Sequence, residues 1–185
     1  AVPVYGCGFL PDGSAWDSEF SKMNQEQCDH WVELWEPSRY LESAEMPVFF
    51  VNGTNDFAYW LPSYHKTYEL VSERTLRIEI SMKHGHQPGW APKEIGLFID
   101  SVVNRGKPLL ALGTPEEKDG SLSLEVADGL GIQSAALHFT TGDGPPKDRK
   151  WETAPASIDG RRIHASTPKD GSIYYLSVTD ERGAM

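Results

Sequence analysis

Apolar residues form short runs in the first part of the chain, and these runs predict strands. Met46–Val51 is continuously apolar and is followed by Asn52 and Gly53, which is typical of a strand buried on both faces of a parallel sheet. Thr75–Ile80 alternates apolar and polar residues and predicts a strand nearer a sheet edge. Ala1–Tyr5 predicts a further strand end, although Pro3 weakens a central position in a sheet.

Apolar positions at helical spacing separate these runs. They predict helices over residues 18–35, 62–71 and 92–104. Pro92 suits the first turn of the last of these helices. The resulting alternation of strand and helix predicts an α/β class with a parallel sheet and right-handed crossovers.

The second part of the chain has only strand-like runs and turns. Strands are predicted near residues 121–126, 134–140, 149–153, 161–166 and 172–179. Clusters of Gly, Asp and Pro, such as Gly142–Pro146, separate them. Short strands at this spacing predict a small all-β, immunoglobulin-like sandwich. With a linker at 105–112, the predicted domains are residues 1–107 and 108–185.

Charge and composition exclude several classes of function. The net charge is −10 and the isoelectric point is about 5.0, which disfavours binding to nucleic acid or to an anionic membrane surface. No apolar run approaches the roughly 20 residues of a transmembrane helix, and no signal-peptide pattern is visible near Ala1. Nothing in the sequence calls for a cofactor. Cys7 and Cys28 fit two buried thiols better than one disulfide, and they lack the spacing of metal ligands.

Candidate chemistry lies where the two predicted parallel strands end. Asp56 closes the turn that follows the buried strand, and His84 and His86 follow the next strand. Adjacent parallel strands end at the same sheet edge, so we expect Asp56 to meet one of the two histidines. A carboxylate that orients an imidazole is two-thirds of an acyl-transfer triad. Turn-forming and solvated loop residues are the alternative interpretation, and a metal site would need a third ligand.

The sequence offers no convincing nucleophile. The Gly-x-Ser-x-Gly pattern of a nucleophile elbow is absent, and Ser14 lies in a turn. Cys7 stands between two glycines at a strand end, but no helix is predicted directly after it.

Four aromatic residues fall in loops near the same predicted edge and are candidates for substrate binding: Trp16, Tyr59, Trp60 and Trp90. The alternative is that they cover the edges of the core.

Taken together, residues 1–107 resemble the carboxyl-terminal half of an α/β-hydrolase, similar to esterases of the acetyl xylan esterase and dienelactone hydrolase groups. In that resemblance the turn at Asp56 matches the acid, and the loop after Leu76–Ile80 matches the histidine. Gly85-His86 resembles the Gly-His that often marks this loop, which favours His86 over His84. The nucleophilic Ser would then lie upstream of Ala1.

The resemblance implies a fragment of a serine hydrolase that acts on a carboxylic ester of an acylated carbohydrate, in a secreted or periplasmic setting. A non-catalytic carbohydrate- or protein-binding module and a peptidase remain alternatives. An incomplete sheet would expose an edge at Val2–Tyr5, so we expect association there, with a second copy or a separate chain.

Overall fold

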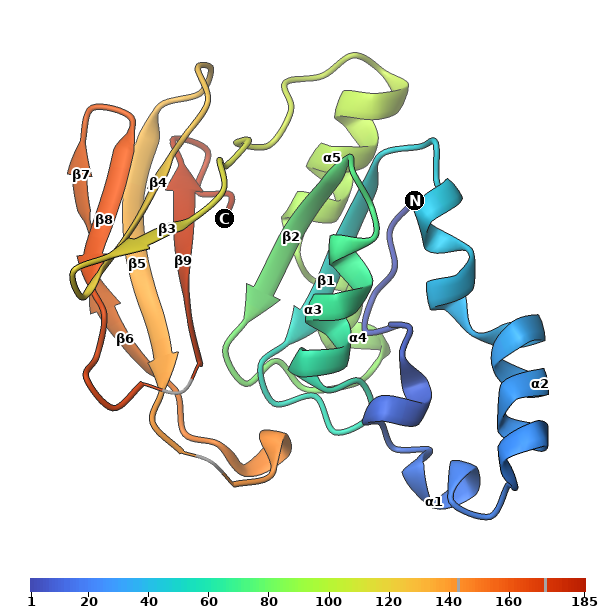
Figure 1. The fold of residues 1–185 in the computed structure, drawn as a ribbon. Helices are drawn as coiled ribbons and strands as arrows, with labels where there is room; N and C mark the ends of the chain where they lie inside the picture. Colours follow the sequence, from blue (N-terminus) through green and yellow to red (C-terminus); the bar gives the residue numbers. More distant parts are fainter. Residues whose placement is uncertain (143, 172) are drawn as a thin grey trace. The chain divides into compact units, whose positions relative to one another are not determined.

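The computed structural model describes residues 1–142, 144–171 and 173–185, and the chain forms two compact units (Figure 1). The first unit comprises Ala1–Pro92 and Pro146–Asp148, and the second comprises the described residues of Lys93–Pro145 and Arg149–Met185. The sequence predicted a boundary between residues 107 and 108, whereas here the division along the chain comes at Pro92. The predicted turn at 142–146 contains Asp143 and the predicted strand at 172–179 begins at Ser172. These two residues lie outside the described part of the chain.

The first unit is built on a short parallel sheet. Strand β1 (Val48–Gly53) pairs in parallel with β2 (Arg74–Glu79), with Phe50 opposite Leu76. Every residue of β1 is buried, as its continuous apolar run predicted. Residues 1–5 run beside β1, and the amide of Tyr5 donates to the carbonyl of Val51 over 2.8 Å.

The sequence predicted the extended parallel sheet of an α/β-hydrolase, and this prediction is wrong. Within the described residues, parallel pairing is limited to β1 and β2 and one bridge between Val4 and Val51. Pro3 has no amide proton to donate, and Tyr5 turns into the left-handed region with φ of 66°. The first segment follows β1 as far as Tyr5, with the amides of Phe49 and Val51 donating to the carbonyls of Ala1 and Pro3, and then turns away. The remaining strands form small antiparallel sheets.

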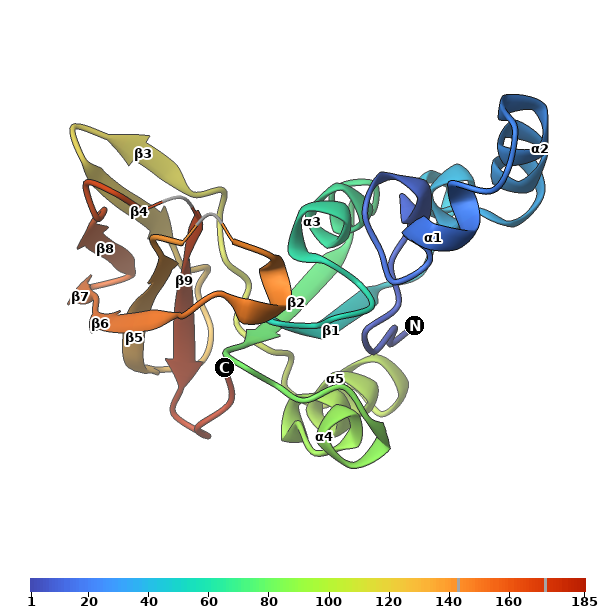
Figure 2. The ribbon, with the colours of Figure 1, turned by 90° about the horizontal axis from the view of Figure 1, so that it is seen from below.

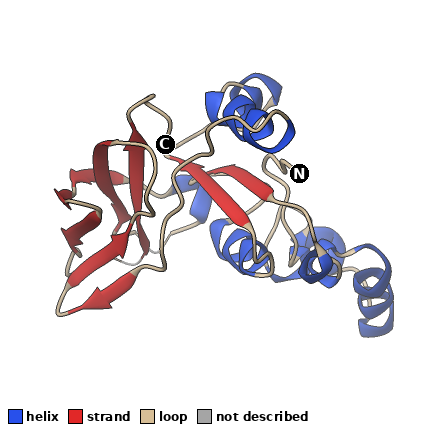
Figure 3. Ribbon diagram, turned by 90° about the horizontal axis from the view of Figure 1, so that it is seen from above, coloured by secondary structure: helices blue, strands red, loops and turns tan. Residues whose placement is uncertain are grey.

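Helices cover both faces of the short sheet. The first unit contains the helices α1 (Asp17–Phe20), α2 (Gln25–Trp35), α3 (Leu61–Glu69) and α4 (His86–Trp90). Helix α3 lies on one side of β1 and β2 and α4 on the other (Figures 2 and 3). The helix predicted over 18–35 is two helices, because Asn24 is extended and caps α2 in a reciprocal capping box with Gln27.

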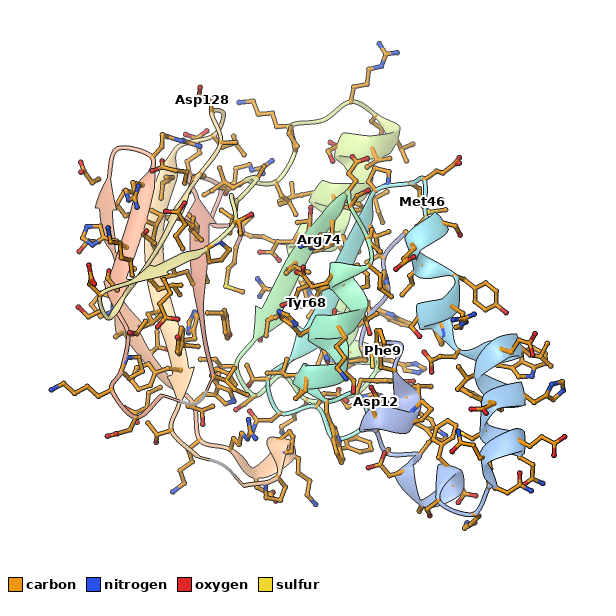
Figure 4. All side chains as sticks on the ribbon, viewed as in Figure 1. Phe9, Asp12, Met46, Tyr68, Arg74 and Asp128 are labelled. Carbon is orange, nitrogen blue, oxygen red and sulfur yellow. The ribbon has the colours of Figure 1, made fainter. Side chains whose placement is uncertain are left out.

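Aromatic packing fixes α3 against the sheet. Tyr64 is fully buried, and its ring meets the ring of Phe50 edge-on with centroids 6.0 Å apart. Tyr68 lies beneath the guanidinium of Arg74, 5.9 Å from ring centroid to Cζ (Figure 4). These contacts hold the loop that joins β1 to α3, which carries Asp56.

The second unit contains helix α5 (Lys93–Val103) and two antiparallel sheets. One sheet has the strand order β3-β4-β8-β7, with β3 (Glu116–Lys118), β4 (Ser121–Glu125), β8 (Arg162–Ser166) and β7 (Ser157–Asp159). The other has the order β6-β5-β9, with β6 (Glu152–Pro155), β5 (Ile132–Thr140) and β9 (Ile173–Asp180). Leu124 and Ile163 of the first sheet pack with Val178 of the second in a common apolar core.

Candidate functional site

The turn after β1 holds Asp56 in a fixed position. Its Oδ1 atom accepts hydrogen bonds from the backbone amides of Ala58 and Tyr59, both over 2.8 Å. Asn52 braces the same turn from inside, because its side-chain amide donates to the carbonyl of Tyr59 over 3.1 Å. The Asp56 side chain is completely buried, so the carboxylate depends on these partners in place of water.

His84 reaches the other carboxylate oxygen. Its Nδ1 atom lies 2.7 Å from Asp56 Oδ2, and 30% of its side chain is exposed. The parallel register pairs Gly53 with Glu79, so the segments that follow the two strands leave the sheet side by side. The pairing of Asp56 with a histidine is therefore a direct consequence of strand adjacency.

This arrangement suits proton transfer at the second ring nitrogen. Asp56 engages Nδ1, which favours the tautomer with its proton on Nδ1 and a lone pair on Nε2. The partly exposed ring leaves Nε2 able to take a proton from a hydroxyl or from water. A buried carboxylate beside Nδ1 would stabilise the imidazolium that results.

Tyr5 is a site residue that the sequence did not single out. Its ring stacks on the His84 imidazole, with centroids 4.3 Å apart and an interplanar angle of 23°. Its hydroxyl lies 2.9 Å from the carbonyl of Lys83 and 3.0 Å from that of Gly85. Burial raises the pKa of Tyr5, so this hydroxyl stays neutral. The sequence signal that could have pointed to Tyr5 is its place at the end of the apolar run Ala1–Tyr5, directly before Gly6.

His86, which the sequence favoured, lies elsewhere. It is the first residue of α4, and its ring packs against that of Trp90 with centroids 5.2 Å apart. The structure therefore brings His84, and not His86, to Asp56. Gly85 is the N-cap of this short helix, so His86 lies within α4, whereas His84 precedes the helix.

The aromatic candidates divide into two groups. Tyr59 lies 6.1 Å from His84 between ring centroids, and Trp16 lies 5.5 Å from Tyr59, so Tyr59 is beside the histidine and Trp16 is one ring farther out. Phe57, which the sequence did not single out, is 54% exposed and lies 5.1 Å from His84. Trp60 is linked to the same turn by a hydrogen bond from its indole to the carbonyl of Phe57. Trp90 accompanies His86 instead.

Cys7 is unsuited to the role of nucleophile. It is a free, buried thiol, and burial raises its pKa to about 12. The thiolate is the reactive form of cysteine, and this environment opposes its formation. Cys28 is also a free thiol. In the part of the chain that the structure describes, no group of three or more His, Cys, Asp or Glu residues could hold a metal ion. No helix among those residues is long and apolar enough to cross a membrane.

Comparison with known proteins replaces the expected relationship. Residues 18–145, more than two-thirds of the chain, match the family described as PhoPQ-activated pathogenicity-related protein. Comparison with curated proteins found no match, and comparison with solved structures found none. The predicted membership of the α/β-hydrolase esterases is therefore wrong, since the family match points to a different group and nothing points to those esterases. The chain belongs to the PhoPQ-activated pathogenicity-related protein family.

Proposed function

We propose that this chain supplies the acid–base half of a serine hydrolase, with His84 as the general base and Asp56 as the residue that orients it. The observation that carries the proposal is the contact between His84 Nδ1 and Asp56 Oδ2, at 2.7 Å, with Asp56 fully buried. The two backbone amides on Oδ1 prevent the carboxylate from turning away. A carboxylate fixed in this way lets the imidazole keep one orientation through a catalytic cycle.

The reaction follows from the free ring nitrogen. His84 Nε2 removes the proton of a serine hydroxyl while the hydroxyl oxygen attacks the acyl carbon of an ester. The imidazolium then gives this proton to the leaving alcohol as the bond between acyl carbon and alcohol oxygen breaks. Water attacks the acyl-serine in the same manner, with His84 again as base, and releases the carboxylic acid. Asp56 orients the imidazole through Nδ1 in both steps. We assign the serine to sequence outside residues 1–185.

The substrate we propose is a carboxylic ester that carries a ring, such as an acylated carbohydrate. Three aromatic side chains support this assignment: Tyr59 and Phe57 lie beside His84, and Trp16 packs against Tyr59. Trp16 and Phe57 are 42% and 54% exposed, so both have surface to offer a ligand. Aromatic side chains with a few placed polar groups are the usual lining of small-molecule sites.

Ester hydrolysis by two forms of the protein tests this function. The 185-residue chain should hydrolyse p-nitrophenyl acetate only at the slow rate of water attack assisted by His84. The longest translated product of the gene that contains this sequence should be active and should be labelled by a serine-directed phosphonate. In that product His84→Ala should abolish turnover, whereas His86→Ala should change it less than about threefold.

Three results would overturn the proposal. The first is full activity of the His84→Ala variant, and the second is robust turnover by the 185-residue chain that depends on Cys7. The third is binding of a carbohydrate by the longest product with no hydrolysis of any ester, which would favour a binding module. Cleavage of an anilide with the same dependence on His84 would instead identify a peptidase, because the same acid–base pair serves amides.

A further inference from the structure

We infer that Tyr5 is a positioning residue that holds the His84 imidazole against Asp56. The contacts of Tyr5 carry this inference, and its meaning for catalysis rests on the function proposed above. Tyr5 comes from the segment before Gly6, whereas His84 follows β2, so the two residues meet only in the folded first unit.

The hydroxyl of Tyr5 fixes the backbone around His84. It lies within hydrogen-bonding distance of the carbonyls of Lys83 and Gly85, which precede and follow His84 in sequence. A hydroxyl with one proton can donate to either carbonyl or share the proton between them. In both cases the peptide groups on the two sides of His84 are tied to one side chain.

The ring of Tyr5 fixes the imidazole itself. Stacking at 4.3 Å covers one face of the His84 ring, while Asp56 holds its Nδ1 edge. Rotation of the imidazole away from Asp56 would lose both contacts together. Stacked aromatic rings attract one another beyond the effect of the area that they bury.

Tyr5 is itself held in place from two directions. Its amide donates to Val51 of β1 over 2.8 Å, and its backbone adopts φ of 66°, which a residue with a side chain rarely does. On the other side a Cβ atom at Gly89 of α4 would lie 2.9 Å from Tyr5 Cε2. The ring of Tyr5 is therefore packed against the backbone of α4. Unusual backbone of this kind persists only where the surrounding structure enforces it.

Tyr40 provides a matched control within the same unit. Its hydroxyl also lies near two successive carbonyls, 2.8 Å from that of Glu33 and 3.0 Å from that of Leu34. However, Tyr40 is 52% exposed, and the hydrogen bonds of its hydroxyl go to a different helix and not to the backbone beside His84. Tyr40→Phe therefore removes the same kind of hydrogen bond without touching the site.

The test follows the proton on His84 Nδ1 by NMR in the 185-residue chain, after selective labelling of histidine with ¹⁵N. Tyr5→Leu should raise the exchange rate of this proton with solvent by about tenfold or more, because the hydrogen bond to Asp56 opens more often. Tyr5→Phe keeps the ring and should give a smaller increase, and Tyr40→Phe should give none. If Tyr5→Leu fails to fold, Gly89→Ala, which pushes on the Tyr5 ring, should raise the exchange rate in its place.

Unchanged exchange in folded Tyr5→Phe and Tyr5→Leu variants would overturn the inference. So would unchanged exchange in both Tyr5→Phe and Gly89→Ala when Tyr5→Leu does not fold. The measurement needs no turnover, so it separates the two proposals. Loosening of His84 in a protein without hydrolase activity would keep the positioning role and refute the function. Activity that depends on His84, together with an exchange rate that the substitutions at Tyr5 leave unchanged, would support the function and refute the positioning role.

Discussion

His84 in the first unit and His138 in the second are both held by hydrogen bonds, but the groups that hold them differ. His84 follows a strand and contacts the buried carboxylate of Asp56 through Nδ1. His138 lies within β5, where its Nδ1 is 2.9 Å from the hydroxyl of Thr153 and its Nε2 is 2.8 Å from the hydroxyl of Ser177. Both nitrogens of His138 are therefore occupied by neutral groups.

The difference shows why closeness to a serine does not by itself mark a histidine as a general base. Ser177 and His138 are as close as a nucleophile and its base, so a search for serine–histidine pairs would select them. Yet the other nitrogen of His138 meets a hydroxyl, which cannot stabilise an imidazolium as a carboxylate does. The orienting carboxylate, rather than proximity to serine, distinguishes His84.

The two environments arise from the two sheet types. In the antiparallel sheet the register places Tyr175 and Thr153 opposite His138 on neighbouring strands, so its side chain becomes a cross-strand link. In the parallel pair, by contrast, the strands end together and their following segments meet at one edge. Polar side chains in those segments converge without having to pair along the strands.

The largest expected effect that would sharpen this comparison is on catalysis. In the longest translated product, His84→Ala should reduce kcat/KM for p-nitrophenyl acetate by on the order of 10⁴-fold or more. His138→Ala should leave the same constant within about twofold, because its contacts link strands of the other unit. A similar loss in both variants would erase the distinction between the two histidines.

Removal of the orienting carboxylate should have the next largest effect, on stability. Asp56→Ala leaves two backbone amides and His84 Nδ1 without their acceptor, and it should lower the free energy of unfolding by about 3 kcal/mol. Asp12→Ala removes an exposed ion pair with Lys66 and should cost less than about 1 kcal/mol. Urea unfolding of the two variants measures the difference, and equal costs would contradict the buried role of Asp56.

A smaller effect is expected at the cross-strand link. Ser177→Ala removes the partner of His138 Nε2 from a partly buried position and should lower the free energy of unfolding by about 1 kcal/mol. It should not change hydrolysis of p-nitrophenyl acetate. A large loss of activity in this variant would identify Ser177 as a nucleophile and refute the structural interpretation of the pair.

The smallest effect concerns pH. Burial lowers the pKa of His138 below the value of about 6.5 that it has in an unfolded chain. Its contribution to stability is therefore complete above that value and is lost as the pH falls below it, since the unfolded chain takes up the proton first. On acidification the free energy of unfolding of the wild type should therefore fall relative to that of the His138→Gln variant. A difference that is constant with pH would contradict the effect of the partly buried environment on the pKa of His138.

Much of the local structure could be predicted from the sequence, and so could the meeting of Asp56 with a histidine. The continuous apolarity of Val48–Val51 identified β1, and adjacency of parallel strands then implied the pairing. The sequence could not decide between His84 and His86, because it does not show that Gly85 caps a short helix that begins at His86. The extent of the parallel sheet could not be predicted either, because the apolar run at Ala1–Tyr5 does not reveal that the chain turns away from β1 at Tyr5, whose φ is 66°.

The most direct test of the account is the protonation of His84, read from two-bond ¹H–¹⁵N correlations of the histidine rings. The account predicts that, once the ring is neutral, the proton resides on Nδ1 in His84 and Nε2 carries none, and that Asp56→Ala abolishes this preference. His86 should be unaffected by the same substitution. A neutral His84 with its proton on Nε2, or a response to Asp56→Ala in His86 instead, would contradict the account.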